Sequence, residues 1–182
     1  MASLRISESF GLSAPPERVW PLLTDPAGIA DCLPGAELEA VEGDAFIGTV
    51  RVKVGPVTVN YNGEVRFTEV DEGNRRLSMV GNGTDRRGGG SASLTLHSAV
   101  TEEDGGSRVS IDADVQIAGK LVRFGRGMFQ AVSKQLLGEF SERLAKKLQG
   151  EGPVPGAESE TLDTGKLLLR TLAGKLKRSD GD

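Results

Sequence analysis

Few residues in this sequence have the types and the spacing that enzyme catalysis requires. The only histidine, His97, lies in an alternating stretch with Thr95 and Ala99 on the same predicted outer side of a strand. Asp112 and Asp114 share an outer side in a later stretch, where water would prevent two carboxylates from taking the different pKa values that acid–base catalysis needs. We therefore expect these ionisable side chains to face solvent.

The single cysteine and the single tyrosine are the remaining candidates for chemistry. Cys32 has no histidine near it in the sequence, and the stretch "CLPG" that begins with it is typical of the end of a helix. One cysteine excludes an intramolecular disulfide and favours a reducing compartment such as the cytoplasm. Tyr61 lies on the predicted inner side of a strand, where its hydroxyl could donate a hydrogen bond to a ligand carbonyl or, equally, to the backbone or water. No zinc, P-loop or dinucleotide motif occurs, so the sequence favours binding over catalysis and no metal site is expected.

The formal charge of −4 is unevenly distributed along the 182 residues. Residues 161–178 hold five basic side chains and one acidic one, a local charge of +4, so the other residues together carry −8. The net acidity argues against nucleic acid as a partner. The first residues lack the apolar run of a signal peptide, and no segment approaches the roughly 20 apolar residues that span a bilayer.

Hydrophobic periodicity predicts an α+β domain over residues 1–149. Period-two alternation predicts a first strand over residues 4–12, and two proline-bounded segments within residues 13–35 predict short helices. Residues 36–119 alternate almost throughout, which predicts an antiparallel meander of about six strands with one apolar face. A helical stripe predicts one long closing helix over residues 120–149. The expected architecture is therefore a curved antiparallel sheet of about six to seven strands wrapped round a long C-terminal helix.

The inner face of the predicted sheet is apolar and rich in glycine. Glycines allow a sheet to bend and also leave space, so Gly48, Gly63, Gly81 and Gly83 could both curve the sheet and hollow out its interior. Composition alone leaves an ordinary filled core and a ligand cavity equally open. The residues that we expect to contact a ligand in such a cavity are Val50, Val52, Val59, Tyr61, Gly63, Val65, Leu77, Met79, Gly81, Leu94, Leu96, Phe124, Met128 and Val132.

Two segments are candidates for the rim of this cavity. The residues of the second short helix that we expect at the rim are Ile29, Cys32 and Leu33. Residues 81–92 ("GNGTDRRGGGSA") form the most flexible stretch that the domain is predicted to contain, because glycine permits backbone angles that other residues resist, and they would suit a gate. Arg86 and Arg87 would then meet lipid phosphates or an acidic partner, unless they are solvated arginines of an exposed hairpin.

Residues 150–160 have the composition of a flexible linker, and residues 161–182 form a tail with an amphipathic pattern. In the tail most leucines fall on one side of a helix and most basic residues on the other, although two glycines weaken that helix by about 1 kcal/mol each. A short helix of this kind is marginal in water and would fold on an anionic membrane, in a partner's groove or against its own domain. The residues that we expect to bind the membrane are Lys166, Leu168, Leu169, Arg170, Leu172, Lys175, Leu176, Lys177 and Arg178.

Several stretches resemble those of one protein family: "APPERVWPLLTDP", "CLPGAE", "VRVKVGPVTVNYNGEV", "GGGSASLTL" and "DADVQIAGKLVRFG". With the order of the elements, they resemble the G-subunit family of carbon monoxide dehydrogenases, within the START-like and polyketide-cyclase-like superfamily, over about residues 2–148. The resemblance implies a helix-grip fold and a non-catalytic accessory protein of molybdenum carbon monoxide dehydrogenases and similar hydroxylases. It also implies placement of that enzyme at the cytoplasmic membrane and binding of a lipophilic quinone, menaquinone or ubiquinone, with no covalent cofactor.

Three functions remain open from the sequence. The first is a carrier that holds a quinone-like lipophilic ligand and serves a carbon monoxide dehydrogenase-type hydroxylase on the inner face of the cytoplasmic membrane. The second is a membrane-recruitment adaptor with a filled core and no ligand; a Gly63→Leu substitution, which would fill the cavity, should impair only the carrier. The third and least favoured is a cyclase- or hydrolase-type enzyme, which would need more polar groups in the cavity than Tyr61 provides.

Overall fold

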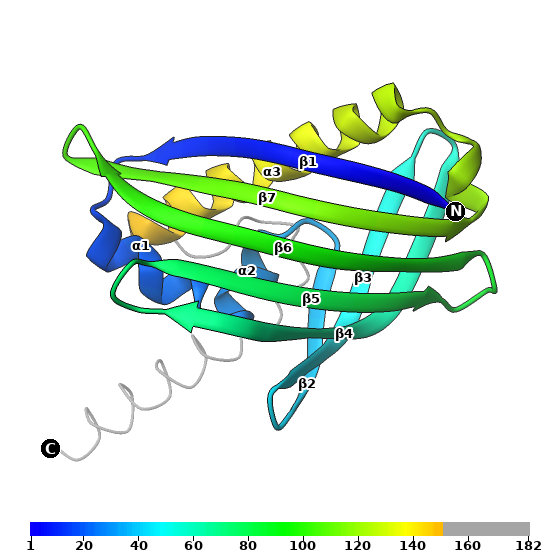
Figure 1. Cartoon of the computed structure of the whole chain (residues 1–182), viewed down its shortest axis with the longest axis horizontal. Helices are drawn as coiled ribbons and strands as arrows, with labels where there is room; N and C mark the ends of the chain where they lie inside the picture. The colour runs from blue at the N-terminus through cyan, green and yellow to red at the C-terminus, as the bar shows by residue number, and fades with distance from the viewer. Residues whose placement is uncertain (151–182) are drawn as a thin grey trace, which may run out of the picture.

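The computed structural model describes residues 1–150, which form one curved sheet wrapped round a long helix (Figure 1). The sheet has seven strands in the order β1-β7-β6-β5-β4-β3-β2, and every neighbouring pair is antiparallel. The elements are β1 (Ala2–Leu12), α1 (Pro16–Leu23), α2 (Pro26–Cys32), β2 (Ala36–Glu42), β3 (Ala45–Val54), β4 (Val57–Asp71), β5 (Arg76–Asp85), β6 (Gly90–Glu103), β7 (Gly106–Gly119), η1 (Lys120–Arg123) and α3 (Arg126–Leu148). This architecture confirms the predicted α+β fold. The predicted tail, and the predicted linker beyond its first residue, lie outside the described residues.

Prolines set the start of both short helices. α1 begins at Pro16, where the missing N–H has no helical partner to lose, and Glu17 suits the positive end of the helix. α2 begins at Pro26, and the Asp25 carboxylate accepts a hydrogen bond from the Ala27 N–H at 3.2 Å. α1 contacts β6 and β7, and α2 contacts β2 and α3, so the two short helices join the sheet to the long helix.

The C-terminal helix differs from the prediction of one continuous helix over residues 120–149. A 3₁₀ turn occupies Lys120–Arg123, and the backbone is extended at Gly125 before α3 begins at Arg126. Glycine is a poor helix former, which is the physical reason for the interruption at this position. The break also places Met128 in the first turn of α3, where it is 41% exposed rather than part of a continuous apolar stripe. α3 has 23 residues, and none of the described helices is long and apolar enough to cross a membrane.

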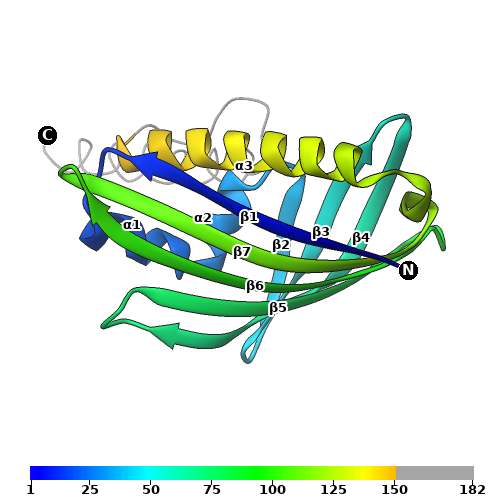
Figure 2. The same ribbon diagram turned by 45° about the horizontal axis from the view of Figure 1, so that its top comes forward.

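A row of glycines crosses the sheet where it bends. Gly48 of β3 pairs with Gly63 of β4, which pairs with Gly83 of β5. A Cβ added at Gly63 would overlap the carbonyl oxygen of Asn82, so only glycine allows the two backbones to approach this closely. Figure 2 shows the result: β2, β3 and part of β4 run at a steep angle to β5, β6 and β7.

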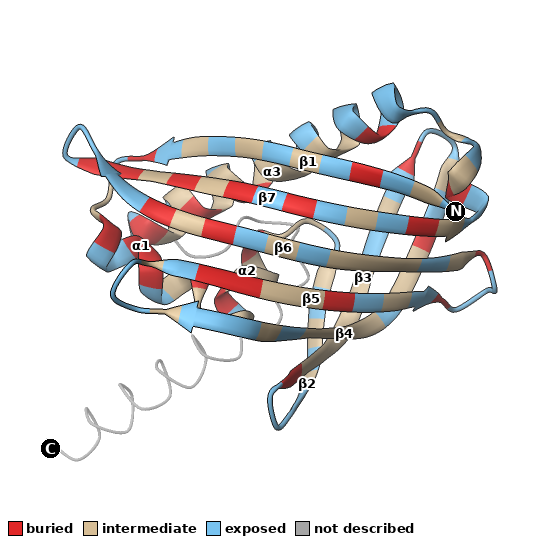
Figure 3. Cartoon of the chain, in the orientation of Figure 1, coloured by how far each residue is buried: buried red, intermediate tan, exposed pale blue. Residues whose placement is uncertain are grey.

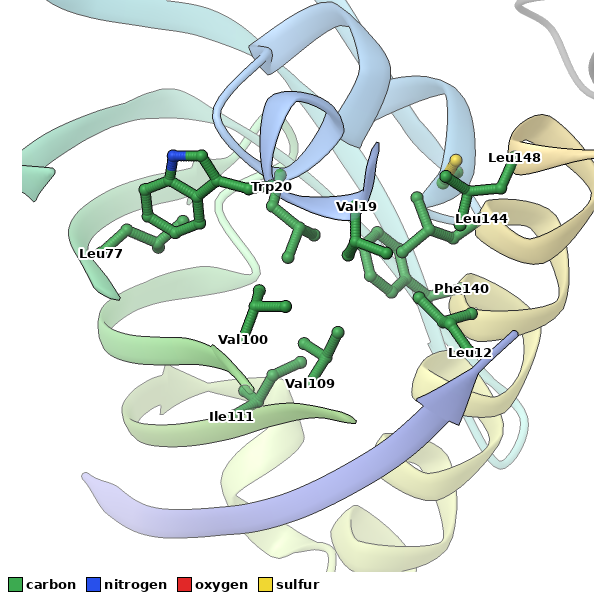
Figure 4. Close-up of a cluster of buried hydrophobic side chains, with 12 residues drawn as sticks. Leu12, Val19, Trp20, Leu77, Val100, Val109, Ile111, Phe140, Leu144 and Leu148 are labelled. Atoms are coloured by element: carbon green, nitrogen blue, oxygen red, sulfur yellow. The ribbon is translucent and has the colours of Figure 1, made fainter. Parts of the chain in front are cut away.

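Two packed clusters hold the sheet against the helices. The first cluster joins α1 and the end of α3 to the sheet (Figure 4), and its buried residues are Leu12, Val19, Trp20, Leu23, Cys32, Leu77, Val100, Val109, Ile111, Phe140, Leu144 and Leu148. The second cluster joins η1 and the start of α3 to the sheet, and its buried residues are Leu4, Val54, Val59, Ile117, Leu121 and Phe129. Figure 3 shows buried residues alternating with exposed or half-buried ones along β7, as the period of a strand requires.

Candidate ligand-binding cavity

A cavity of about 400 Å³ lies between the inner face of the sheet, α2 and α3, and its lining is almost wholly apolar. Its position follows from the two packed clusters. In β4, Val59 belongs to the second cluster, Tyr61 and Val65 line the cavity, and Phe67 packs against the first cluster. In α3, Leu136 lines the cavity between the residues that the helix gives to each cluster. The cavity is therefore the part of the interior that neither cluster fills.

Eight of the residues predicted to contact a ligand line this cavity: Val50, Val52, Tyr61, Gly63, Val65, Met79, Gly81 and Leu94. Six do not: Val59, Leu77, Leu96, Phe124, Met128 and Val132. All of these six except Met128 belong to the packed clusters or pack against them. For Val59, Leu77 and Leu96 the physical reason is that alternation fixes the face of a strand on which a residue lies but not its position along the strand. Phe124, Met128 and Val132 come from the C-terminal helical segment, where an apolar stripe likewise fixes a side of the helix but not what that side packs against. Ligand contact by the eight lining residues stays a prediction.

The three rim residues predicted at the second short helix lie in two different environments. Ile29 and Leu33 line the cavity, whereas Cys32 is only 2% exposed and lies in the first packed cluster. Leu33 is the C-cap of α2, where the backbone changes from helical to extended, so it does not continue the helical direction of Cys32. Burial raises the pKa of the Cys32 thiol, which keeps this side chain protonated at neutral pH.

The second predicted rim segment, residues 81–92, borders the cavity only at its two ends: Gly81, Asn82, Gly83 and Ala92 line it, but Arg86 and Arg87 do not. Arg86 and Arg87 instead line a separate polar groove. Most of residues 81–92 form strands, because β5 continues to Asp85 and β6 begins at Gly90. The connection is a short hairpin turn, which matches the exposed-hairpin alternative of the sequence analysis rather than a glycine-rich gate at the cavity mouth.

The buried side chain of Asp85 holds this turn in place. Its carboxylate accepts hydrogen bonds from the backbone N–H of Gly89 at 2.7 Å and from that of Asn60 at 3.2 Å. Burial alone would raise the pKa of Asp85, but the N–H groups of Gly89, Asn60 and Arg87 together lower this pKa below its usual value. The charged carboxylate therefore ties the β5–β6 turn to β4.

Several lining residues were absent from the predicted set. Phe46, Ala92 and Val115 share the inner alternation of their strands, so that signal could have included them. α2 and β2 are too short for a periodic signal, and they add Pro26, Ala30, Ala36 and Leu38 to the wall. Leu38 lies in the edge strand opposite Gly48, where the absence of a side chain lets the backbones of β2 and β3 approach closely.

Tyr61 is the aromatic polar group in the cavity wall. It is half-buried, and no hydrogen bond joins its hydroxyl to another described residue. Burial raises the pKa of the Tyr61 phenol, and the negative charge of Asp85 raises it further. The phenol therefore remains a neutral hydrogen-bond donor at physiological pH, which suits a carbonyl acceptor on a ligand.

The outer face of the sheet carries the histidine, which is exposed as predicted. His97 Nδ1 lies 2.7 Å from the Ser78 hydroxyl oxygen, a partner that the sequence analysis did not identify. Asp112 is opposite His97 in register, but its carboxylate accepts a hydrogen bond from the Ser7 hydroxyl at 2.7 Å. No ion pair joins Asp112 to His97 within the described residues, so these side chains do not form a serine–histidine–aspartate relay.

A sequence model of the family described as the G subunit of carbon monoxide dehydrogenase (CoxG) matches residues 9–149. The chain belongs to this family. The match runs from within β1 to just beyond the end of α3, so the whole cavity lies inside the CoxG region. A comparison with curated proteins finds no match for the chain.

Solved structures with the same fold come from several bacteria. A conserved protein from Geobacillus kaustophilus has a TM-score of 0.72 at 21% identity, covering 81% of this chain and 96% of that chain. A START superfamily protein from Mycobacterium smegmatis has a TM-score of 0.58 at 10% identity, covering 80% and 97%. The ZhuI aromatase/cyclase from Streptomyces sp. R1128 has a TM-score of 0.55 at 14% identity, covering 81% and 94%. At these identities the similarity shows that the CoxG chain has the START-like helix-grip fold.

Proposed function

We propose that this CoxG chain is a non-catalytic accessory protein whose cavity binds a lipophilic ligand, a respiratory quinone of the menaquinone or ubiquinone type. It links a carbon monoxide dehydrogenase-type molybdenum hydroxylase to the inner face of the cytoplasmic membrane. The protein extracts or presents the quinone and does not transform it. The observation that carries the proposal is the apolar cavity of about 400 Å³ lined by the sheet, α2 and α3.

The size and the lining of the cavity suit part of a quinone. Small-molecule sites have volumes of about 300–1,000 Å³ and few polar groups, and this cavity falls at the lower end of that range. It would take a ring system and a short part of an isoprenoid tail rather than a complete long-tailed lipid. The side chains of Val50, Met79 and Leu94 supply apolar walls, and burying apolar ligand surface against them favours binding by about 25 cal/mol per Å².

Tyr61 gives the cavity a means of orienting a carbonyl group. Its hydroxyl forms no hydrogen bond with another described residue, so a quinone oxygen could accept one without displacing a protein partner. The raised pKa keeps the proton on the phenol. A neutral phenol is a poor base at neutral pH, which supports binding rather than proton transfer as the task of this group.

The partner and the membrane follow from the family and from the sequence of the tail. The family description names a subunit of carbon monoxide dehydrogenase, which supports that class of hydroxylase as the partner. Residues 161–178 carry a local charge of +4, and each basic residue near an anionic leaflet contributes about 1 kcal/mol of attraction. Reversible attachment of this kind suits a protein that moves a quinone between a membrane and an enzyme.

Solvent extraction of the full-length protein, purified from a respiring bacterium, tests the proposal. We expect mass spectrometry to find a quinone at close to one molecule per protein. A Val50→Phe variant should lose at least about nine-tenths of this quinone, because the larger side chain occupies the cavity. It should remain folded, since hydrophobic substitutions of this kind cost about 1–3 kcal/mol.

Val41→Phe is the matched control, because Val41 lies in β2 with 58% of its surface exposed and does not line the cavity. This variant should keep the quinone of the wild-type protein. An extract without quinone, from protein that still floats with anionic vesicles, would overturn the carrier and favour the membrane adaptor. Retention of quinone by a folded Val50→Phe protein would place the ligand elsewhere.

A further inference from the structure

Three arginines converge on the outer face of the sheet, away from the ligand cavity. Arg51 of β3 and Arg86 and Arg87 of the β5–β6 turn line a polar groove of about 290 Å³. Arg51 alternates with Val50 and Val52, which line the cavity, so its side chain lies on the opposite face of β3. The groove is thus separate from the proposed quinone site.

Amide side chains orient two of the three guanidinium groups without neutralising them. Arg51 Nε donates to Asn60 Oδ1 at 3.2 Å, and Arg86 Nε donates to Asn62 Oδ1 at 2.8 Å. These bonds use only the Nε–H of each guanidinium, so they do not occupy its terminal NH₂ groups. An oriented guanidinium fork matches the geometry of phosphate and carboxylate oxygens.

The positive charge of the groove is only partly compensated. Arg86 forms an ion pair with Glu39 at 3.7 Å, and both side chains are about half exposed, so the pair is weak. Glu37 also lines the groove. Three arginines therefore face two carboxylates around the same space, which leaves an excess of one positive charge.

The turn that carries two of the arginines is held in place before any ligand binds. The Asp85 carboxylate accepts the N–H groups of Gly89 and Asn60, and the Arg86 N–H donates to the Asn60 carbonyl at 3.3 Å. A fixed turn lowers the entropic cost of gathering three cations around one anion.

We propose that Arg51, Arg86 and Arg87 form an anion site that binds a phosphate ester, on the face of the sheet opposite the ligand cavity. Thr49 of β3 and Glu37 of β2 line both the groove and the cavity, so the two sites share part of one wall. A phosphate in the groove would therefore lie beside the wall of the cavity. The ester could be a lipid headgroup or a soluble phosphate ester, because both present the same oxygens. The inference does not depend on the proposed quinone binding.

Titration of the ¹⁵N-labelled full-length protein with glycerol 3-phosphate tests the site directly. We expect saturable NMR shifts at the Nε–H signals of the three groove arginines. Arg87→Gln should weaken the affinity at least about tenfold, because it removes a charge-assisted hydrogen-bond donor. Arg5→Gln is the matched control: Arg5 is an exposed arginine on the outer face of β1, and its loss should change the affinity less than about twofold.

A variant that should strengthen phosphate binding makes the test sharper. Glu39→Gln frees Arg86 from its ion pair and removes a negative charge beside the groove, so we expect glycerol 3-phosphate to bind about two- to fivefold more tightly. Equal, unsaturable shifts in the wild-type, Arg87→Gln and Arg5→Gln proteins would overturn the site. So would a Glu39→Gln protein that binds more weakly than wild type.

Co-sedimentation with phosphatidylglycerol vesicles identifies the source of the phosphate. The tail is present in every variant, so its contribution cancels in the comparison. If the groove takes a headgroup, Arg87→Gln should reduce vesicle binding several-fold more than Arg5→Gln does. If both variants lose the same amount while glycerol 3-phosphate still binds, the ligand is a soluble ester. No quinone is added in these measurements, and Arg5, Glu39 and Arg87 do not line the cavity, so the outcome leaves the carrier proposal untouched.

Discussion

The packed clusters and the cavity are built from the same strands and the same helix, but from side chains of different size. In the first cluster Trp20 and Phe140 bring large rings against the sheet, and each is no more than 6% exposed. At the cavity, inward positions of neighbouring strands are occupied by Gly63, Gly83 and Ala92 instead. The comparison shows that the cavity exists because the sheet bends where its inward residues are too small to fill the space.

α2 lies between the two regions and faces both. Cys32 is buried in the first cluster, while Ile29 and Leu33 line the cavity one turn apart. At the end of α2, Lys147 of α3 pairs with Asp31 at 3.1 Å. The helix that closes the cavity is therefore anchored by the packed region, which allows the wall of a hollow site to remain ordered.

Leucine-to-alanine substitutions, one in the first cluster and one in the cavity wall, should have the largest and most different effects on the free energy of unfolding. Leu144→Ala in the first cluster should lower the free energy of unfolding by about 3–5 kcal/mol, because Leu144 is 1% exposed and its loss leaves a void. Leu94→Ala in the cavity wall should cost about 1–2 kcal/mol, since Leu94 already borders empty space. Urea denaturation followed by circular dichroism measures both.

The difference between the two variants, rather than either value alone, tests the comparison. Equal losses would mean that the interior beside Leu94 is as tightly packed as that beside Leu144. An unchanged slope of the unfolding free energy against urea would show that both variants unfold from native states of similar compactness.

Two glycine substitutions should separate the residues that bend the sheet from those that only leave space. Gly63→Ala should lower the unfolding free energy by about 1–3 kcal/mol, because its Cβ would overlap the Asn82 carbonyl oxygen. Gly81→Ala should change stability by less than about 1 kcal/mol, since its Cβ would meet the movable Val65 side chain at 3.3 Å. Thermal unfolding of the two proteins checks that Gly63→Ala is the less stable one.

This contrast also changes how the cavity should be filled experimentally. Gly63→Leu, which the sequence suggests as a filler, would push β4 and β5 apart and confuse a loss of binding with a loss of fold. If Gly63→Ala proved as stable as the wild-type protein, the close approach of the two backbones would not depend on glycine. Val50→Phe avoids this difficulty because a side chain already occupies that position.

Alternation in the sequence was sufficient to predict the sheet and its inner face, because the period of a strand is dictated by the backbone. It could not place residues along a strand. Val59 and Tyr61 are two residues apart on one face of β4, yet Val59 is 1% exposed in the second cluster and Tyr61 lines the cavity. What differs is how closely each is covered: Val59 is part of a cluster with Leu121 and Phe129, which are far away in the sequence, whereas Tyr61 only borders that cluster and also lines the cavity.

The misplaced rim has a related cause. Glycines around Arg86 and Arg87 suggested a flexible loop, but composition says nothing about long-range hydrogen bonds. Asp85 fixes that turn through the N–H of Asn60, a residue of another strand. The pair that the sequence placed at the cavity mouth therefore lies with Arg51 at the outer groove.

The smallest predicted effect concerns the polar group of the cavity. Tyr61→Phe should weaken quinone binding about three- to tenfold, the usual contribution of one hydrogen bond, and should leave the fold intact. Isothermal titration of the full-length protein with a short-chain ubiquinone measures the change. A Tyr61→Phe protein that binds the quinone as tightly as the wild type would mean that the ligand carbonyl does not lie at this residue.

The raised pKa of Tyr61 adds a dependence on pH with a definite sign. Burial, followed by the charge of Asp85, holds the phenol protonated above the ordinary tyrosine pKa of 10.0, so wild-type affinity should stay constant from pH 6 to about pH 9. The folded state then binds this proton more tightly than the unfolded chain, so the stability that it contributes is present below pH 10 and is lost as the pH rises through the higher folded pKa. The raised pKa would be contradicted if the affinity of the wild-type protein fell between pH 7 and 9 and that of the Tyr61→Phe protein did not. Such a result would require a phenol that ionises more readily in the cavity than in water.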